Sequence, residues 1–405
     1  MAAQPTIPAS VRPDSALAAC ALDGSGAVSP EAWDECVAPG SGPLKHGYLR
    51  AWEKSELRGL ESRPVVAYRD GSPHPVAICP AHLYDLDIAT VRSPGSSGPV
   101  RAIRHLWDSF LFARTYELGS PTPLTNPFLV SEPELRPQAV ATLIEVALEE
   151  AESREAEFVL VQNFTSREGP VAEELAGRGF AGVPILPTAT IDLPYESFDD
   201  YLGAMRSQYR RRARQALERS AHLEVRHLRE FEDEADELAR LWSLVHDRAT
   251  EVKREILTPE FFRAVSSVED VSVLALRRED GSIASFGLLL SDHPWLFFLQ
   301  TGFSEEAGRE EAAYFRLLYE IVRFGIENEF EQADFGMTTL EPKLDVGAVP
   351  VPLYAWVRHQ NAAFRRIIRG LAAGPMKPPE VEPRHVFKEA PPTAAELVAR
   401  RPTPA

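Results

Sequence analysis

Apolar and polar positions follow the same order twice along this chain. Each copy begins with a strand-like apolar run broken at an Asp-Gly pair, which favours a tight turn with positive φ. A stretch with apolar residues at helical spacing comes next, and it leads at once into a short apolar run typical of a buried strand. The two copies occupy residues 65–85, 135–152 and 157–164 in the first half, and 271–292, 310–329 and 332–337 in the second.

This duplicated pattern predicts a mixed α/β (α+β) fold made of two similar domains. Each domain would hold a mixed, largely antiparallel sheet flanked by helices. The length of 405 residues also favours two or three domains over one. We expect a flexible N-terminal segment, a first domain, a second domain, and a Pro-rich tail that either wraps around the molecule or stays loose. Their expected bounds are 1–28, 29–193, 194–371 and 372–405.

Composition excludes several classes of protein. The net charge of -17 and the isoelectric point near 5.2 argue against binding to duplex DNA. The chain contains only Cys20, Cys36 and Cys79, without paired spacing, which is typical of a reducing compartment. We find neither a signal-peptide pattern nor an apolar run long enough to span a membrane. The sequence therefore predicts a cytoplasmic protein.

Known catalytic motifs are missing from the sequence. The chain has no GxSxG nucleophile turn, no Walker A loop, no GxGxxG fingerprint and no HExxH motif. Its 10 histidines are scattered without metal-ligand spacing, so we expect no metal site. A covalent hydrolase, a P-loop nucleotidase and a zinc enzyme are therefore all disfavoured.

A basic stretch stands out within this acidic chain. Residues 197–220 have an apolar face at helical spacing, which predicts one continuous helix with Ser197 as its N-cap. Like charges one turn apart cost about 0.2–0.5 kcal/mol per pair, so the arginines need a partner. That partner is either the acidic run 230–237 folding back, or an anionic ligand such as the phosphates of CoA or the acceptor end of a tRNA. The arginines concerned are Arg206, Arg210, Arg211, Arg212 and Arg214.

A family resemblance rests on four stretches of the second half, 198–217, 257–265, 310–330 and 340–359. Together they are similar to the FemAB-like branch of the GNAT acyltransferase superfamily, which includes peptidoglycan-biosynthesis-type acetyltransferases. The resemblance implies tandem GNAT domains, of which the first is degenerate and the second carries the active site. Two features depart from the family. Pro342 stands where some relatives have a histidine, and the glycine-rich phosphate loop is not intact.

Four side chains become candidates for catalysis within this resemblance. Lys343 would stabilise the oxyanion as an amine attacks an activated carbonyl, and Glu341 would act as the general base. Tyr314 would give a proton to the leaving group, and His246 would line the acceptor pocket. Glu341 and Lys343 are two residues apart, on one side of an extended chain, so a plain ion pair between them is the alternative. For Tyr314 and His246 the alternative is a purely structural role.

The co-substrates follow from the same resemblance. We expect no permanently bound cofactor, and an acyl-CoA or an aminoacyl-tRNA as the donor. The acceptor would be the amine of a small molecule or a peptide. The donor would bind at the basic helix and at the end of the strand-like run 295–303. The residues concerned are Arg206, Arg210, Arg211, Arg214, Gln300, Thr301 and Gly302.

Three functions remain open at this point. The acidic composition and the absence of a long basic coiled-coil insertion favour an acyl-CoA-dependent N-acyltransferase, narrowly. The tandem FemAB-like architecture favours an aminoacyl-tRNA-dependent transferase that forms a peptide bond. The incomplete glycine loop favours a non-catalytic binding protein on a decayed GNAT fold. Four glutamates stand where a diphosphate would bind, which also weakens that phosphate site; they are Glu305, Glu306, Glu310 and Glu311.

Overall fold

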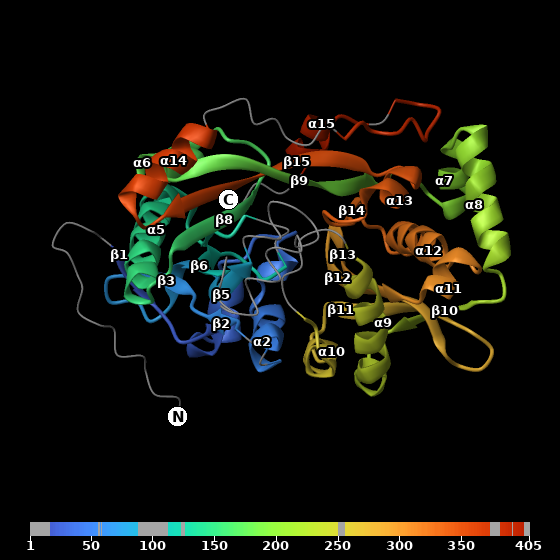
Figure 1. Ribbon diagram of the computed structural model, residues 1–405, viewed down its shortest axis with the longest axis horizontal. Coiled ribbons are helices and arrows are strands. Elements are labelled where there is room, and N and C mark those ends of the chain that lie inside the picture. Colours follow the sequence, from blue (N-terminus) through green and yellow to red (C-terminus); the bar gives the residue numbers. More distant parts are fainter. Residues whose placement is uncertain are drawn as a thin grey trace, which may run out of the picture.

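One long mixed sheet runs through the whole molecule and carries helices on its faces (Figure 1). The computed structural model describes residues 17–55, 57, 59–87, 112–122, 126–249, 256–372, 381–390 and 392–400. Within these residues the long sheet has eleven strands. In spatial order they are β10 (Glu224–Leu228), β11 (Val271–Arg277), β12 (Ile283–Asp292), β13 (Trp295–Phe303), β14 (Gln332–Asp334), β9 (Ala181–Asp192), β15 (Val349–His359), β8 (Phe158–Phe164), β6 (Phe112–Leu118), β5 (Ala81–Asp87) and β2 (Glu61–Ser62).

A second, four-stranded sheet belongs to the first half. Its strands are β1 (Leu17–Ala21), β3 (Val65–Arg69), β4 (Pro75–Cys79) and β7 (Leu129–Val130). Strand β1 pairs with β3, so the prediction of a flexible segment over 1–28 is wrong for residues 17–21. Residues 1–16 lie outside the described part of the chain. The predicted Asp-Gly turn between β3 and β4 is confirmed, with Gly71 at φ +75°.

The predicted duplication is confirmed by two helices that join parallel strands. Helix α5 (Arg136–Ser153) leads into β8, which pairs in parallel with β6. Helix α12 (Ala313–Glu327) leads into β14, which pairs in parallel with β13. Parallel pairs need such a crossover, whereas the flanking hairpins are antiparallel. Each half therefore contains the same helix-and-strand unit.

Helices cover both faces of the second half of the long sheet. One face carries α12 with α7 (Phe198–Ala204) and α8 (Ser207–Arg219). The other face carries α9 (Ala235–Arg248) and α10 (Pro259–Ser266), together with α2 (His46–Lys54) from the first half. The remaining helices named below are α6 (Pro170–Gly177), α11 (Glu305–Arg309), α13 (Leu340–Asp345), α14 (Ala362–Ala372) and α15 (Ala394–Ala399). None of the described helices is long and apolar enough to cross a membrane.

The two halves share strands and a core. Strands β9 and β15 pair along most of their length, and β15 also pairs with β8 of the first half while β9 pairs with β14 of the second. On the helical side, the Trp52 ring of α2 lies 4.7 Å from the Phe261 ring of α10. Lys45, just before α2, forms ion pairs with Asp270 and Asp292 at 2.7 and 2.9 Å. The halves therefore form one continuous body.

The predicted single helix over 197–220 is broken in the structure. Ser197 caps α7 as expected, because its hydroxyl accepts a hydrogen bond from the Asp200 N–H. Met205 then adopts an extended backbone and forms an isolated β-bridge with Phe387. The chain restarts as α8 one residue later. This contact with the tail is long-range, so local periodicity could not reveal it.

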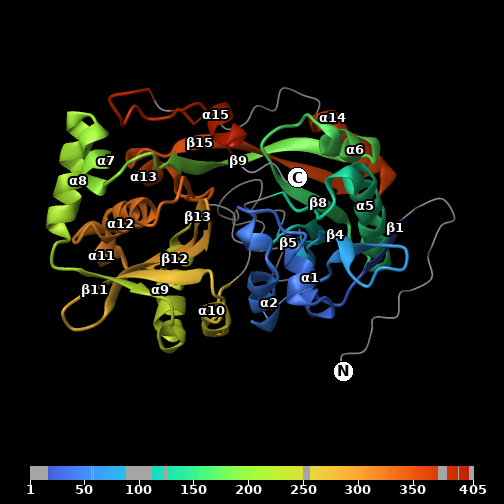
Figure 2. The same cartoon turned by 180° about the vertical axis from the view of Figure 1, so that it is seen from behind.

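The described part of the tail wraps around the second half. Val386 is fully buried, and the Phe387 ring lies 5.9 Å from Tyr195 and 5.8 Å from Tyr201. Helix α15 packs on β15 through the buried Leu397. Figure 2 shows this helix beside β15 from behind. Of the two alternatives for the Pro-rich tail, the structure therefore has the wrapped one.

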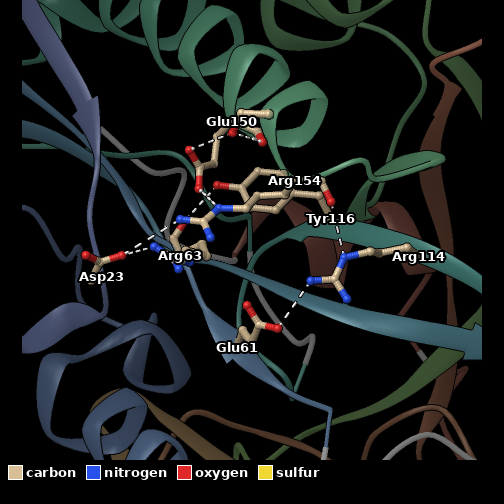
Figure 3. Close-up of polar contacts among 8 residues, drawn as sticks. Asp23, Glu61, Arg63, Arg114, Tyr116, Glu150 and Arg154 are labelled. Atoms are coloured by element: carbon tan, nitrogen blue, oxygen red, sulfur yellow. Dashed lines mark hydrogen bonds and ion pairs between the residues drawn. The ribbon is translucent and has the colours of Figure 1, made fainter.

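A polar network connects the C-terminal end of α5 with β6 and with the segment before β3 (Figure 3). The Tyr116 hydroxyl donates to the Arg63 carbonyl at 2.6 Å, and Arg114 Nε donates to the Arg154 carbonyl at 3.2 Å. Burial lowers the pKa of Arg63, and the nearby Arg154 adds to this effect. These contacts link the end of α5 to β6 and to the segment before β3. The network comprises Asp23, Glu61, Arg63, Arg114, Tyr116, Glu150 and Arg154.

Candidate active site

Strands β13 and β14 begin as a parallel pair and then stop pairing. The paired residues are Trp295–Phe297 and Gln332–Asp334, after which β14 ends and β13 continues to Phe303. Just beyond the paired part, β13 contains a bulge at Leu299, because Leu288 and Leu289 of β12 pair with residues on either side of it. A bulge turns backbone groups away from the regular ladder. Where the two strands separate, β13 no longer pairs with β14. Its backbone N–H and C=O groups can therefore contact a bound substrate there.

Lys343 lies beside this separation. It is only 4% exposed, and its ammonium donates to the carbonyls of Gly336, at 3.3 Å, and of Thr338. Gly336 follows β14, and a Cβ atom added to it would lie 3.9 Å from the Phe298 carbonyl oxygen of β13. A buried ammonium is costly unless it is hydrogen-bonded. The fold thus places one positive charge next to the point where β13 and β14 part.

Glu341 and Lys343 do not lie on one side of an extended chain, so that prediction is wrong. Both belong to helix α13, where residues two apart point in different directions. Pro342 is tolerated because it stands in the first turn, where its missing N–H would have no helical partner. Glu341 is 75% exposed at its side chain and pairs with Arg384 of the tail. The alternative of a Glu341–Lys343 ion pair is therefore also wrong.

The predicted donor residues at the end of β13 attach α9 to the sheet. Gln300 Oε1 accepts a 2.9 Å hydrogen bond from the Trp242 indole, and the Thr301 hydroxyl donates to a β12 carbonyl at 2.8 Å. A Cβ atom on Gly302 would lie 2.6 Å from the backbone of Leu241. These side chains have structural contacts, so a role in donor binding falls to their backbone groups and stays a prediction.

His246 and Tyr314 lie near this same end of β13. The His246 ring stacks on Trp242 with centroids 4.7 Å apart, and its buried Nε2 has no hydrogen-bond partner. Tyr314, in the first turn of α12, stacks on Phe303 at 4.9 Å and is 7% exposed. Arg248 donates to the Phe303 carbonyl at 3.0 Å. The structure thus brings two of the predicted catalytic residues to one end of one strand.

A groove of about 640 Å³ runs between α8 and the N-terminal end of α12. Ala312, at φ +53°, turns the chain into α12, and the first-turn amides of such a helix attract anions. Arg219 donates to the Glu310 carbonyl at 2.9 Å, which fixes its guanidinium beside this turn. The groove ends at Asp345, on the helix that carries Lys343. Its polar and aromatic lining consists of Tyr209, Arg212, Gln215, Glu218, Arg219, Phe315, Tyr319 and Asp345.

The predicted arginine stripe does not line this groove. Arg206 Nε donates to the Phe387 carbonyl at 3.0 Å, and Arg210 donates to the carbonyls of Gly203 and Met205 at 3.3 Å each. Two further candidates, Arg211 and Arg214, are exposed on the outer side of α8. Arg206 and Arg210 therefore serve to join α8 to the end of α7 and to the tail.

The acidic run 230–237 does not fold back onto these arginines, so that alternative is wrong. Glu234 pairs with Arg277 of β11. Asp236 and Glu237 pair with Arg263 and Arg240, at 2.5 and 2.7 Å. The run begins the α9 layer, on the face of the sheet opposite α8, which is why the two charged segments cannot meet.

Comparison with known proteins identifies the second half. Residues 203–343 match the family described as acetyltransferase (GNAT) domain. This range contains α8, the β13–β14 separation, Lys343 and every residue of the groove lining except Asp345. The second half therefore contains a region similar to a GNAT domain. The match covers the part of the chain in which the sequence already placed the active site.

Solved structures extend the comparison to both halves of this protein. The crystal structure of FemX has the same fold, with a TM-score of 0.54 and 14% identity over 84% of this chain and 98% of FemX. A tandem GNAT protein from the clavulanic acid biosynthesis pathway is also similar, with a TM-score of 0.47 and 13% identity over 85% of this chain and 99% of that one. The FemX-like fold therefore covers nearly the whole length.

The curated relatives are longer than this protein. Two Mycobacterium tuberculosis proteins, each named "Putative 8-amino-7-oxononanoate synthase 2", are 26% identical to it over 332 residues. The match covers 78% of this chain but only 42% of each relative. The similarity therefore concerns one part of those proteins.

The predicted donor-binding residues left out both arginines that face the groove, Arg212 and Arg219. Arg212 lies 4.0 Å from Asp345, and Arg219 lies about two helical turns further along the same face of α8. Burial raises the pKa of the Asp345 carboxyl, and Arg212 opposes this shift. The signal that could have found them is their spacing with Ala213 and Ala216, the small buried residues that mark the inner face of α8.

The acidic loop before α12 is partly neutralised. Hydrogen bonds from Arg278 hold the pKa of the Glu311 carboxyl below its usual range, and His222 adds to this. Arg278 donates to Glu311 at 2.6 Å, and His222 Nε2 lies 3.1 Å from it. Glu305 pairs with Arg309 at 2.8 Å. Two of the four loop glutamates are thus bound to cations, which reduces the repulsion of a nearby anion.

Proposed function

We propose that this protein is an N-acyltransferase that moves an acyl group from an acyl-CoA to the amine of a small molecule or peptide. The observation that carries the proposal is the groove between α8 and α12, which leads from the first turn of α12 to the helix of Lys343. The groove gives an anionic donor a place to bind, and the β13–β14 separation gives its acyl end a place to react.

The groove suits the phosphates of CoA for two reasons. Guanidinium groups bind phosphate through paired hydrogen bonds, and Arg212 and Arg219 both line the groove. The N-terminal amides of α12 add a second source of positive potential. These features stand out because the chain as a whole has a net charge of -17.

The reaction would take place beside Lys343. The attacking amine nitrogen forms a bond with the acyl carbonyl carbon, and the Lys343 ammonium stabilises the oxyanion that develops. Collapse of this intermediate breaks the carbon–sulfur bond and releases the CoA thiolate. The amine nitrogen would lose its proton to solvent, and the Tyr314 hydroxyl would protonate the thiolate. Holding both substrates in line supplies much of the rate.

A paired comparison of arginines on α8 tests donor binding. We expect Arg212→Ala with Arg219→Ala to weaken acetyl-CoA and longer acyl-CoA binding by at least tenfold in calorimetric titrations, with less dependence on salt than the parent protein shows. The matched control is Arg211→Ala with Arg214→Ala, which removes the same charge from the outer side of the helix. An equal loss of acyl-CoA affinity in both double variants would mean that only the net charge of α8 matters. That result would contradict binding in the proposed groove.

A second candidate function has support from the fold. FemX is similar to this chain over both halves, and FemAB-like architecture implies an aminoacyl-tRNA as donor. Charged tRNA therefore forms a second arm of the same titration, with uncharged tRNA as its control. Binding of charged tRNA without binding of any acyl-CoA would replace the thioester donor by an aminoacyl ester. Binding of neither would leave the non-catalytic alternative.

A further inference from the structure

The first half contains a large cavity that the proposed acyl transfer does not use. Its volume of about 570 Å³ lies within the range of small-molecule sites. The end of β8 and the N-terminal turns of α5 and α6 form most of its wall. Trp295 and Phe297 of β13 close it from the second half. The cavity therefore exists only because the two halves pack together.

The start of α6 turns unbonded backbone amides toward the cavity. Gly169 is the N-cap residue, at φ +107°, and it gives the helix no side-chain cap. Pro170 has no N–H, so the first amides without a helical acceptor belong to Val171 and Ala172, and both residues line the cavity. Such amides, at the positive end of the helix dipole, favour a carboxylate or another anion.

Asn163 supplies an independent sign of a ligand. It is 8% exposed and lines the cavity, and its side-chain oxygen Oδ1 has no hydrogen-bond partner. Its φ of +70° explains why asparagine is favoured at this position, but the backbone conformation does not account for the unbonded oxygen. Buried polar atoms are nearly always bonded. A ligand N–H beside the carboxylate would satisfy this oxygen.

The rest of the lining defines the remainder of the ligand. Phe164, Trp295 and Phe297 give an apolar, largely aromatic wall. Two carboxylates also line the cavity, but Glu168 is exposed and Glu174 is bound to Arg178 at 2.8 Å. The cavity therefore combines an anion-binding end, a hydrogen-bond acceptor and an apolar wall.

We propose that this cavity binds an amino-acid-like ligand, with a carboxylate, an adjacent N–H group and an apolar side chain. The carboxylate lies on the amides of Val171 and Ala172, the N–H donates to Asn163 Oδ1, and the side chain packs on Phe164 and Trp295. A free amino acid and the C-terminal residue of a peptide share this chemistry. The inference does not depend on the acyl-transfer proposal, because none of the residues proposed for that reaction lines this cavity.

Calorimetric titration of the full chain tests the ligand class. The probes are L-phenylalanine, for a free amino acid, and N-acetyl-L-phenylalanine, for a peptide C-terminus. The probe that binds more tightly shows whether the ligand is a free amino acid or the C-terminal residue of a peptide. L-Phenylalaninamide lacks the carboxylate and 3-phenylpropionate lacks the N–H group, so we expect each to bind at least tenfold more weakly. No heat of binding with either probe, or equal binding of the amide, overturns the proposal and leaves a cavity that holds solvent.

Two pairs of variants test the geometry of the cavity. Asn163→Gly keeps a residue that tolerates positive φ and should weaken probe binding at least tenfold. The control Asn328→Gly, at the end of α12, should leave the affinity unchanged.

The second pair changes the charge beside the cavity. Glu168→Lys should tighten binding about threefold, whereas Glu173→Lys, on the outer side of α6, should leave the affinity unchanged. The second pair keeps the test decisive should Asn163→Gly lose stability in thermal unfolding. Unchanged affinity in both Asn163→Gly and Glu168→Lys contradicts the proposed binding mode.

Discussion

At the scale of single residues, burial separates the two candidates of helix α13. Lys343, proposed to stabilise the oxyanion, is buried against backbone carbonyls, whereas Glu341, proposed as the general base, faces solvent beside Arg384. A buried charge acts more strongly on a developing oxyanion than an exposed one, because water screens it less. The burial of Lys343 is therefore consistent with its proposed role at the acyl carbonyl, and the exposure of Glu341 weakens its predicted role as the general base.

Replacing Lys343 by methionine tests that role. Lys343→Met keeps the length of the side chain and removes the ammonium, so we expect turnover to fall by about 10²-fold, as the loss of one oxyanion donor does elsewhere. Donor affinity should change little. The measurement is steady-state turnover with the donor that binds best. Lys388→Met is the control, since the Lys388 ammonium also donates to a backbone carbonyl, that of Gly203, but lies on the exposed tail. Equal turnover in the two variants would leave Lys343 a structural role only.

At the scale of elements, helix α9 lies unusually close to strand β13. Gly302 permits this approach, because a Cβ atom there would lie 2.6 Å from the Trp242 nitrogen and 2.4 Å from the Phe286 ring. Such distances require backbone to move. The glycine that the family resemblance assigned to donor binding is therefore required by packing, which also fixes where the α9 residue His246 sits.

We expect Gly302→Ala to lower stability by about 1–3 kcal/mol or more, as overpacking does in well-packed cores. Urea unfolding followed by circular dichroism measures the change. Gly203→Ala is the matched control, since Gly203 lies in α7 and nothing is within 4 Å of its added Cβ atom. Alanine is the better helix former there, so that variant should be neutral or more stable. A tolerated Gly302→Ala would mean that α9 can move away from the sheet.

The elements themselves were largely predictable. Helices α5 and α12 and strand β13 lie close to where the apolar spacing put them, because periodicity is a local property. The break between α7 and α8 and the helical form of 340–345 were not, since a distant tail segment fixes Met205 and a single short turn has little pattern to recognise. The groove was missed for a similar reason, as it depends on which face of α8 meets α12.

At the scale of the whole molecule, the halves exchange strands and are not independent. Residues 194–371 contain the whole of the predicted second domain. Without the first half, β14 loses its partner β9 and β15 loses both β9 and β8, while α10 loses α2. Unpaired central strands and an uncovered apolar face lead to aggregation.

We therefore expect residues 194–371 produced alone to be insoluble or to unfold without cooperativity. Residues 17–400 should behave like the full chain in solubility and in thermal unfolding. Joint production of residues 17–193 and 194–400 should restore a soluble complex, because the missing strands are then present. A sharp unfolding transition in isolated 194–371 would show that the shared sheet is not needed for folding.

The sequence by itself determined the types of element, their duplicated order and the GNAT resemblance of the second half. These follow from periodicity and short motifs, which act between neighbours in the chain. Only the tertiary structure decided that β15 joins the first half, that Arg212 and Arg219 face the groove, and that Asn163 lines a cavity between the halves. Each of these depends on contacts between residues far apart in the chain, and no local pattern encodes which face of an element such contacts will cover.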